Sequence, residues 1–186
     1  MPARRIRDRR SARQVEELQR ASLLRLEDAE AEDPRFRMLD TVREYAQERL
    51  DTDLEANAVA ERHSAHYLAL AEDVTGRVFG PHMASALDRL DREHGNLTAA
   101  LRRLTARPDA ARAVRLAAAL WPYWYVRGHT TEARAALAVA LQLPTDEGIT
   151  PARARALLGD GQLALSQGDY AARAHVRSRA PRSAAP

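Results

Sequence analysis

Residues 120–137, LWPYWYVRGHTTEARAAL, carry the clearest fold signal in the chain, because they read as a helix, a glycine turn and a second helix. The first helix extends back to residue 110, is apolar nearly all round and is expected to be buried. Pro122 predicts a kink or a break near Trp121, since proline clashes with the preceding helical turn. After the turn at Gly128, a helix over 131–142 is expected to direct small and apolar residues inward: Ala133, Ala136, Leu137 and Ala140.

The same order of elements returns further along the chain. A helix from Ala152 leads to a turn around Gly168 and a further helix from Tyr170, so that Gly128 and Gly168 mark equivalent positions. Helical hairpins at a regular period are typical of an α-solenoid, in which each hairpin buries one face on the next. The sequence therefore predicts an array of antiparallel helical hairpins.

Two longer helices are expected ahead of these hairpins. Between residues 55 and 78 the core-facing positions step by three and four, as one face of a helix does: Val59, His63, Tyr67, Leu70 and Val74. A second helix from Met83 carries a similar stripe: Leu87, Leu90, His94, Leu97, Leu101 and Leu104. Two hairpins are fewer than solenoids usually need, so these long helices are expected to cap the array.

Residues 35–50, RFRMLDTVREYAQERL, read as a strand that runs into a capped helix. Thr41 and Glu44 have the spacing of a capping box, in which hydroxyl and carboxylate each accept a hydrogen bond from a free backbone amide. A partner strand is expected around residues 22–26, preceded by a short helix over 12–21. Together these elements resemble the wing of a winged-helix domain.

The composition excludes several classes of chemistry. The chain has no Cys, and all 29 basic residues are Arg. Disulfides, thiol catalysis and Cys-based zinc sites are therefore excluded, as are the P-loop lysine and Schiff-base lysines. No apolar run approaches the ~20 residues that span a bilayer. A soluble cytoplasmic protein without membrane contact is expected.

Charge is distributed unevenly. The net charge is +3, but residues 1–13 hold six Arg against Asp8, and residues 171–186 hold four Arg and no acid. The body between these tails is therefore acidic, which argues against a nucleic-acid cleft running along it. The chain divides into a disordered Arg-rich arm (1–13), a winged-helix remnant (14–52), a long helical cap (53–107), helical hairpins (108–172) and a disordered basic tail (173–186).

The hairpins resemble tetratricopeptide repeats. In the hairpin around Gly168, the positions where that repeat prefers a large, a small and an aromatic residue hold Leu157, Gly161 and Tyr170. The earlier hairpin matches the later positions of the repeat at Leu120, Ala133, Leu137, Ala140 and Pro144. The chain also resembles the centre of STAND or NB-ARC ATPases. The resemblance is carried, in order, by the segments RFRMLDTVREYAQERL, ERHSAHYLALAE, LDREHGNLTAALRRL, LWPYWYVRGHTTEARAAL and LALSQGDYAARA. These ATPases are the LuxR-like and AfsR-like transcriptional regulators of high-GC bacteria.

The resemblance implies a mostly α fold, in which a tetratricopeptide-like array follows a small winged-helix remnant with one β-hairpin. It also implies that ATP or ADP binds a domain missing here, because no P-loop motif occurs, and that this chain needs no cofactor of its own. Related ATPases carry Met-His-Asp where Met38, Leu39 and Asp40 stand. Leu39 thus occupies a vestigial nucleotide-sensing position, and a core role in the winged helix is expected for it.

Candidate sites are few. Four of the chain's nine aromatic residues lie close together at Trp121, Tyr123, Trp124 and Tyr125. The two tryptophans are expected in the core. The two tyrosines are expected on an exposed surface that binds a protein or small ligand. Arg127 beside them is expected to pair with an acidic partner.

Catalytic and metal sites are not expected. His63 and His66 could share a metal with Glu61, Glu72 or His94, but hydrogen-bonded core histidines explain them better. Ser64 faces a different direction from its neighbouring histidines. Asp88, Asp91 and Glu93 are expected on the solvent face of their helix.

The expected function is the non-catalytic sensor and protein-interaction portion of a STAND-type transcriptional regulator, truncated so that it lacks the P-loop ATPase and ends inside its array. DNA would then be contacted only indirectly or through a missing domain. A free-standing helical adaptor and a small winged-helix DNA-binding protein are the alternatives. Glu16 and Glu17 on the first helix argue against the last, because acids face phosphate unfavourably.

Overall fold

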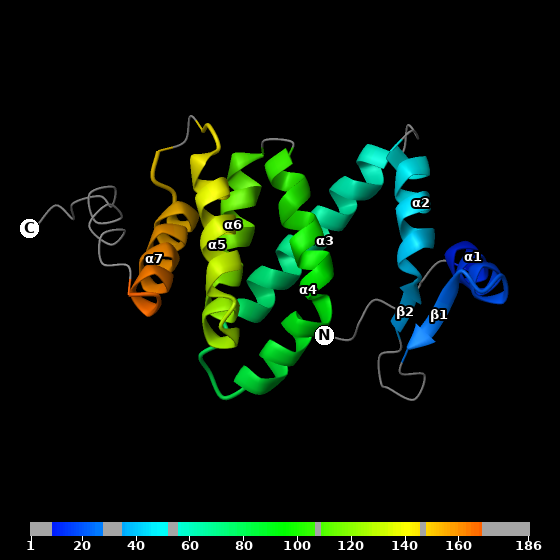
Figure 1. Ribbon diagram of the computed structural model, residues 1–186, viewed down its shortest axis with the longest axis horizontal. Helices are drawn as coiled ribbons and strands as arrows, with labels where there is room; N and C mark the ends of the chain where they lie inside the picture. Colours follow the sequence, from blue (N-terminus) through cyan, green and yellow to red (C-terminus); the bar gives the residue numbers. More distant parts are fainter. Residues whose placement is uncertain (1–8, 28–34, 52–55, 107–108, 146–147, 169–186) are drawn as a thin grey trace, which may run out of the picture. The chain divides into compact units, whose positions relative to one another are not determined.

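The computed structural model describes residues 9–27, 35–51, 56–106, 109–145 and 148–168 (Figure 1). These residues form two compact units that divide between Asn57 and Ala58. The fold is mostly α with one β-hairpin, which confirms the expected fold class. The helix predicted from Tyr170 and the basic tail 173–186 lie outside the described residues.

The first unit holds two helices and the hairpin. α1 (Arg9–Arg20) begins within the stretch assigned to the disordered arm, and is followed by β1 (Leu24–Glu27), β2 (Arg35–Met38) and α2 (Asp40–Asp51). The strands pair antiparallel, with Leu24 opposite Met38 and Leu26 opposite Phe36. The strand-to-helix reading of residues 35–50 is therefore correct.

Apolar side chains of the first unit remain exposed. No described side chain in residues 12–49 is buried, and five large apolar side chains are more than a third exposed: Leu18, Leu26, Phe36, Leu39 and Tyr45. Others are half-buried, among them Leu23, Leu24, Met38 and Val42. The expected core role of Leu39 is wrong, because its side chain is 44% exposed. Within the described residues of this unit, a two-stranded hairpin with short helices offers no second layer to bury these side chains.

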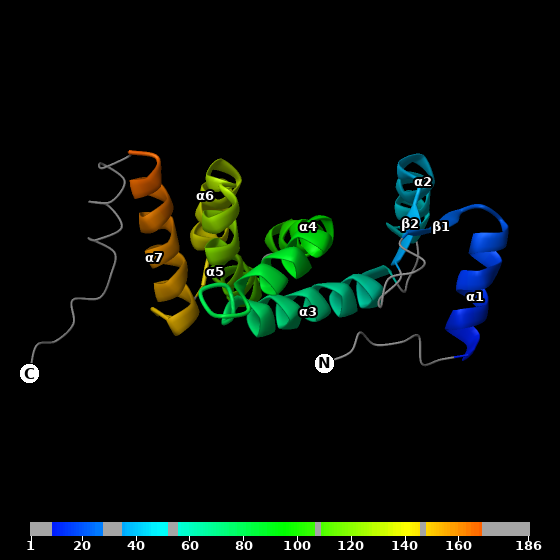
Figure 2. The same cartoon turned by 90° about the horizontal axis from the view of Figure 1, so that it is seen from below.

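The second unit is a set of packed helices, α3 (Ala56–Thr75), α4 (Met83–Ala106), α5 (Ala110–Arg127), α6 (Thr130–Gln142) and α7 (Pro151–Ser166). In Figures 1 and 2, α5, α6 and α7 lie beside one another, as the hairpin array predicts. Their core is built largely from alanine and leucine. No helix among the described residues has the length and apolar character to cross a bilayer.

α5 is the central helix of this unit and packs against α4, α6 and α7. It runs unbroken through Pro122, so of the two predicted outcomes near Trp121, a kink or a break, the break is wrong. Proline removes only one backbone donor, and Pro122 is buried among neighbouring helices that hold the chain in place. Asp109 caps the start of α5, and Gly128 ends it in the left-handed conformation at φ 76°.

The contact between α5 and α7 depends on a glycine. A Cβ atom built on Gly159 would lie 2.4 Å from Cγ of Trp121, far inside van der Waals contact. The tetratricopeptide pattern placed the small residue of this helix at Gly161, whereas the close approach is made by Gly159. Only a residue without a side chain lets the Trp121 indole lie against α7.

Candidate functional site

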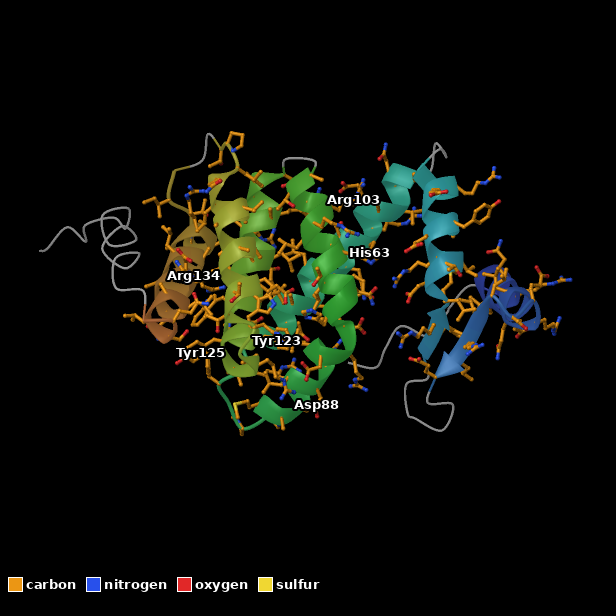
Figure 3. The ribbon with its side chains drawn as sticks, viewed as in Figure 1. His63, Asp88, Arg103, Tyr123, Tyr125 and Arg134 are labelled. Carbon is orange, nitrogen blue, oxygen red and sulfur yellow. The ribbon has the colours of Figure 1, made fainter. Side chains whose placement is uncertain are left out.

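The aromatic segment of α5 divides between core and surface. Trp124 and Tyr123 are 2% and 1% exposed, whereas Tyr125 is 41% exposed. Figure 3 labels the two tyrosines on α5. The core position of Trp124 and the exposure of Tyr125 were expected, but the expected exposure of Tyr123 is wrong. Tyr123 points toward α4, where its hydroxyl finds a partner for hydrogen bonding.

That partner belongs to a polar cluster between α4 and α5. The Tyr123 hydroxyl donates to Asp91 Oδ1 at 2.9 Å, and Arg127 donates to both Asp91 and Asp88, at 3.3 Å to the latter. Burial, followed by the hydrogen bond to Asp91, raises the pKa of Tyr123. Asp88 and Asp91 are exposed, as expected, and they also pair with Arg127.

Two histidines extend this cluster toward α6. His94 Nε2 lies 3.6 Å from Glu132 Oε1, and Nδ1 lies 3.4 Å from the Tyr123 hydroxyl. The His129 ring stacks on His94 with centroids 5.4 Å apart. The cluster therefore ties α4, α5 and the start of α6 together, and its charges are largely matched inside the protein.

α5 also contributes to an exposed apolar surface. We use the name aromatic surface for Phe79, Trp121 and Tyr125, whose rings follow one another at centroid distances of 6.2 Å and 6.4 Å. Phe79 is 64% exposed and Trp121 is half-buried. Sequence reasoning missed Phe79, although a large apolar residue in the turn before Gly80 and Pro81 was a usable signal.

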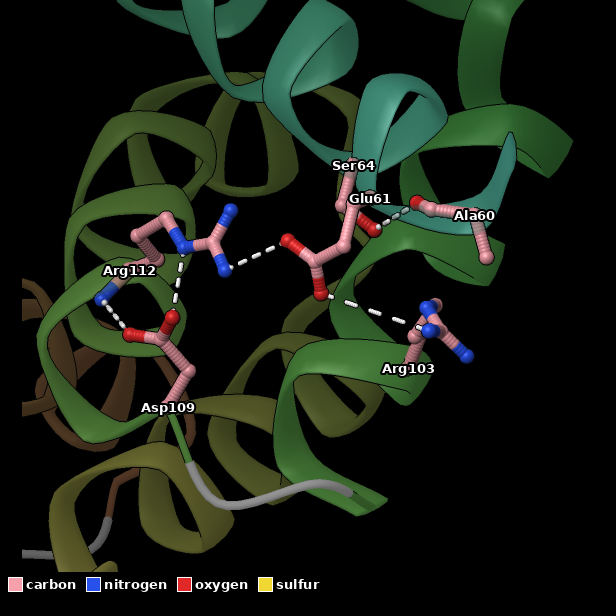
Figure 4. Close-up of polar contacts among 6 residues, drawn as sticks. All are labelled: Ala60, Glu61, Ser64, Arg103, Asp109 and Arg112. Carbon is pink, nitrogen blue, oxygen red and sulfur yellow. Dashed lines mark hydrogen bonds and ion pairs between the residues drawn. The ribbon is translucent and has the colours of Figure 1, made fainter. Parts of the chain in front are cut away.

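Ion pairs join α3 to α5. Arg115 donates to both carboxylate oxygens of Glu72, each at 2.8 Å. Arg112 contacts Glu61 at 2.7 Å and also binds the capping residue Asp109 (Figure 4). The hydrogen bond to Glu61 raises the pKa of Arg112. Burial alone would raise the pKa of Asp109, but the Arg112 backbone and guanidinium lower it.

The histidines of α3 form no reactive site. Burial lowers the pKa of His63, while a hydrogen bond with Asn96 acts in the opposite direction. Ser64 is buried and donates to the Ala60 carbonyl of its own helix at 2.9 Å, so it faces no histidine base. Across the described segments, no three His, Asp or Glu side chains are placed to hold a metal ion.

Leu39 lies at a hollow in the first unit. The hollow, of about 350 Å³, is lined by residues of both strands and the start of α2: Arg25, Leu26, Glu27, Arg37, Met38, Leu39 and Asp40. The charged side chains around the hollow are paired, since Arg37 pairs with Glu27 and Asp40 with Arg43.

The two acidic residues of α1 are also paired. Glu16 pairs with Arg20, and Glu17 pairs with Arg13, all on the same helix.

Comparison with known proteins connects part of the chain to bacterial regulators. Over 98 residues it is 36% identical to two proteins that carry the name "Putative HTH-type transcriptional regulator", Mb0914c of Mycobacterium bovis and Rv0890c of Mycobacterium tuberculosis. The match covers 53% of this chain but 11% of each relative, so the chain spans about a tenth of the curated proteins it matches. No protein-family profile and no solved structure matches it.

Proposed function

We propose that this chain is the non-catalytic, protein-binding portion of a STAND-type transcriptional regulator that lacks the P-loop ATPase. The observation that carries the proposal is the aromatic surface, which exposes Phe79 and Tyr125 on a rigid helical array. Large aromatic residues exposed together are the type that dominates protein interfaces. The similarity to proteins named as transcriptional regulators supports a regulatory role.

The proposed partner is a protein or peptide rather than a small polar ligand. Arg127 was expected to pair with an acidic partner, but Asp88 and Asp91 already engage its guanidinium. The aromatic surface therefore offers mainly apolar contact with a polar rim.

We also propose that the chain binds no ATP or ADP, since Leu39 supplies no hydrogen-bonding group at its hollow and no lysine is available for a phosphate.

Selection of peptides from a random display library on the immobilised full-length chain tests this function. Peptides that bind the wild type are expected to lose roughly tenfold or more in affinity with Phe79→Ala or Tyr125→Ala, as truncated hot-spot residues do. Val139→Ala is the matched control, because Val139 is 50% exposed on α6 and lies outside the aromatic surface. Binding that survives both aromatic substitutions would overturn the proposed site, and saturable ADP binding would overturn the proposed loss of nucleotide contact.

A second candidate function is DNA binding by the first unit. It is favoured by the HTH-type name of the relatives and by Arg25 and Arg37, which stand opposite each other on the hairpin. Duplex DNA binding is then expected to weaken with rising salt and with the paired change Arg25→Ala, Arg37→Ala. Binding that disappears only when the Arg-rich segments 1–13 and 171–186 are removed would instead indicate non-specific attraction.

A further inference from the structure

The hydroxyl of Thr75 makes a contact that leaves its own helix. Thr75 is the last residue of α3, and its hydroxyl donates to the backbone carbonyl of Ala119 in α5. Serine and threonine hydroxyls in helices commonly donate to a carbonyl of the preceding turn of the same helix. Thr105 of α4 does so, since its hydroxyl donates to the Leu101 carbonyl at 3.1 Å. The Thr75 contact instead joins two helices, through residues 44 apart in the sequence.

The turn of α5 that accepts this hydrogen bond is short of a backbone donor. Pro122 has no N–H group, so the carbonyl of Ala118, four residues before it, loses its usual helical donor. Thr75 supplies a hydroxyl donor to the next carbonyl, that of Ala119. A carbonyl oxygen has two lone pairs and can accept such an additional hydrogen bond. A donor from α3 therefore enters α5 in the turn that the proline weakens.

The turn that begins at Thr75 carries the most exposed ring of the aromatic surface. Phe79 follows Thr75 by four residues and lies between α3 and α4. An exposed ring is held mainly through its backbone, so its position depends on how the turn is fixed. Val78 fixes the turn next to Phe79, because its side chain is fully buried and its N–H donates to the Thr75 carbonyl at 3.1 Å. The Thr75 hydroxyl fixes the start of the turn on α5.

We infer that Thr75 is a positioning residue of the aromatic surface. Its hydrogen bond ends at Ala119, two residues before Trp121, and holds the turn so that the rings of Phe79 and Trp121 lie 6.2 Å apart. Trp121 is placed independently of the turn, since it belongs to α5 and lies against Gly159 of α7. Thr75 thus joins two segments of the chain into one surface.

The inference rests on the function proposed for the aromatic surface and adds to it. Binding costs less conformational entropy when the contacting side chains are already in place. Phe79 and Trp121 come from a turn and a helix that are far apart in the sequence. A hydrogen bond that fixes one relative to the other therefore favours binding without touching the partner.

Fluorine NMR of the full-length chain tests the inference without any partner. The chain has only two phenylalanines, Phe36 and Phe79, so labelling with 4-fluorophenylalanine gives two signals, which Phe79→Leu assigns. The Phe79 signal of the folded wild type should differ from its position in the urea-unfolded chain, because the Trp121 ring lies nearby. Thr75→Val keeps the shape of the side chain but removes the donor, and should move the Phe79 signal toward the unfolded position. The Phe36 signal, from the first unit, should not move.

Two comparisons separate the loss of the hydroxyl from general damage to the fold. Thr105→Val removes a half-buried hydroxyl that bonds only within α4 in the described residues, and should leave the Phe79 signal in place. Thr75→Ser and Thr75→Ala differ only in the hydroxyl, so the first should keep the wild-type signal and the second should shift it. Circular dichroism checks that each variant is folded. A Phe79 signal that stays in place in Thr75→Val and Thr75→Ala, or that moves equally in Thr105→Val or Thr75→Ser, overturns the inference.

Peptide binding separates this inference from the proposed function. For peptides selected on the wild type, Thr75→Val should weaken binding roughly threefold or more, and Phe79→Ala should cost less in the Thr75→Val background than in the wild type. Strictly additive losses would show that Thr75 does not act through Phe79. A selection that yields no peptides, together with a Phe79 signal that responds as expected, would contradict the proposed function and support the positioning of Phe79 by Thr75.

Discussion

Tyr123 is the buried residue whose ionisation should be visible in the stability of the protein. Burial and the hydrogen bond to Asp91 raise its pKa above the ordinary value of 10.0. Below pH 10 the tyrosine holds its proton in both the folded and the unfolded states. As the pH rises further, the unfolded chain loses that proton first, and the folded state loses stability until the folded pKa is reached.

We therefore expect the free energy of unfolding to fall above pH 10 by at most about 1.4 kcal/mol per pH unit from this group. Tyr123→Phe removes the hydroxyl and should flatten that part of the profile. The measurement is denaturant unfolding at a series of alkaline pH values, with Tyr125→Phe as the exposed control on the same helix. An unchanged slope in Tyr123→Phe would show that the hydroxyl is not held as described.

Both tryptophans of α5 were expected in the core, but only Trp124 is buried, and Trp121 is half-buried at the edge of the core. Trp124 was correctly placed in the core, because it continues the apolar face of α5. Tyr123 was misplaced since its burial depends on Asp91, a residue of another helix that local periodicity does not reveal. Phe79 was overlooked because its exposure arises from the turn after α3, outside any helical stripe.

The packing of α7 on α5 depends on the absence of a side chain at Gly159. Gly159→Ala is expected to destabilise the second unit by about 1–3 kcal/mol, because the new methyl group overlaps the Trp121 ring. Gly95→Ala is the matched control, since a Cβ atom there would meet nothing within 4 Å. In α4 that change should stabilise by about 0.5–1 kcal/mol through helix propensity. Thermal or denaturant unfolding of the two variants should therefore move in opposite directions, and a neutral Gly159→Ala would contradict the close contact.

The helices themselves were largely predictable from the sequence. Apolar periodicity located α3 and α4, the helix–turn–helix order located α5, α6 and α7, and Gly128 marked the turn between α5 and α6. The helix through Pro122 was not predictable, because tertiary burial outweighs the local cost of proline. The choice of Gly159 over Gly161 as the contact point was equally hidden, since it depends on the rotation of α7 against a side chain of α5.

The two units are expected to differ in resistance to hydrogen exchange. α1, β1, β2 and α2 have no buried side chain among those described, whereas α5 is buried along most of its length. Amides of the first unit should exchange within the earliest time points of a mass-spectrometric experiment, and those of α5 should exchange last. The matched comparison is α2 against α6, which have similar lengths in the two units. Equal protection of these two helices would show that the first unit is stabilised in a way that the described contacts do not include.

At the level of the whole molecule, the sequence indicated the order of the parts but not the difference in their packing. The strand-to-helix motif and the hairpin array could both be recognised, because each has a local signature. The degree of burial in the first unit could not be recognised, since Leu39 and Tyr45 look like core residues in any amphipathic pattern, yet both side chains are more than a third exposed.

The alanine content of the helical core also has a calorimetric consequence. Ala113, Ala117, Ala133, Ala140 and Ala156 are each fully buried where helices cross. Such residues bring helix axes close together while removing little apolar area from water. Since the heat capacity of unfolding follows exposed apolar area, the second unit should unfold with a small heat-capacity change for its size. Its stability curve is then broad and shallow, changing little with temperature on either side of the maximum.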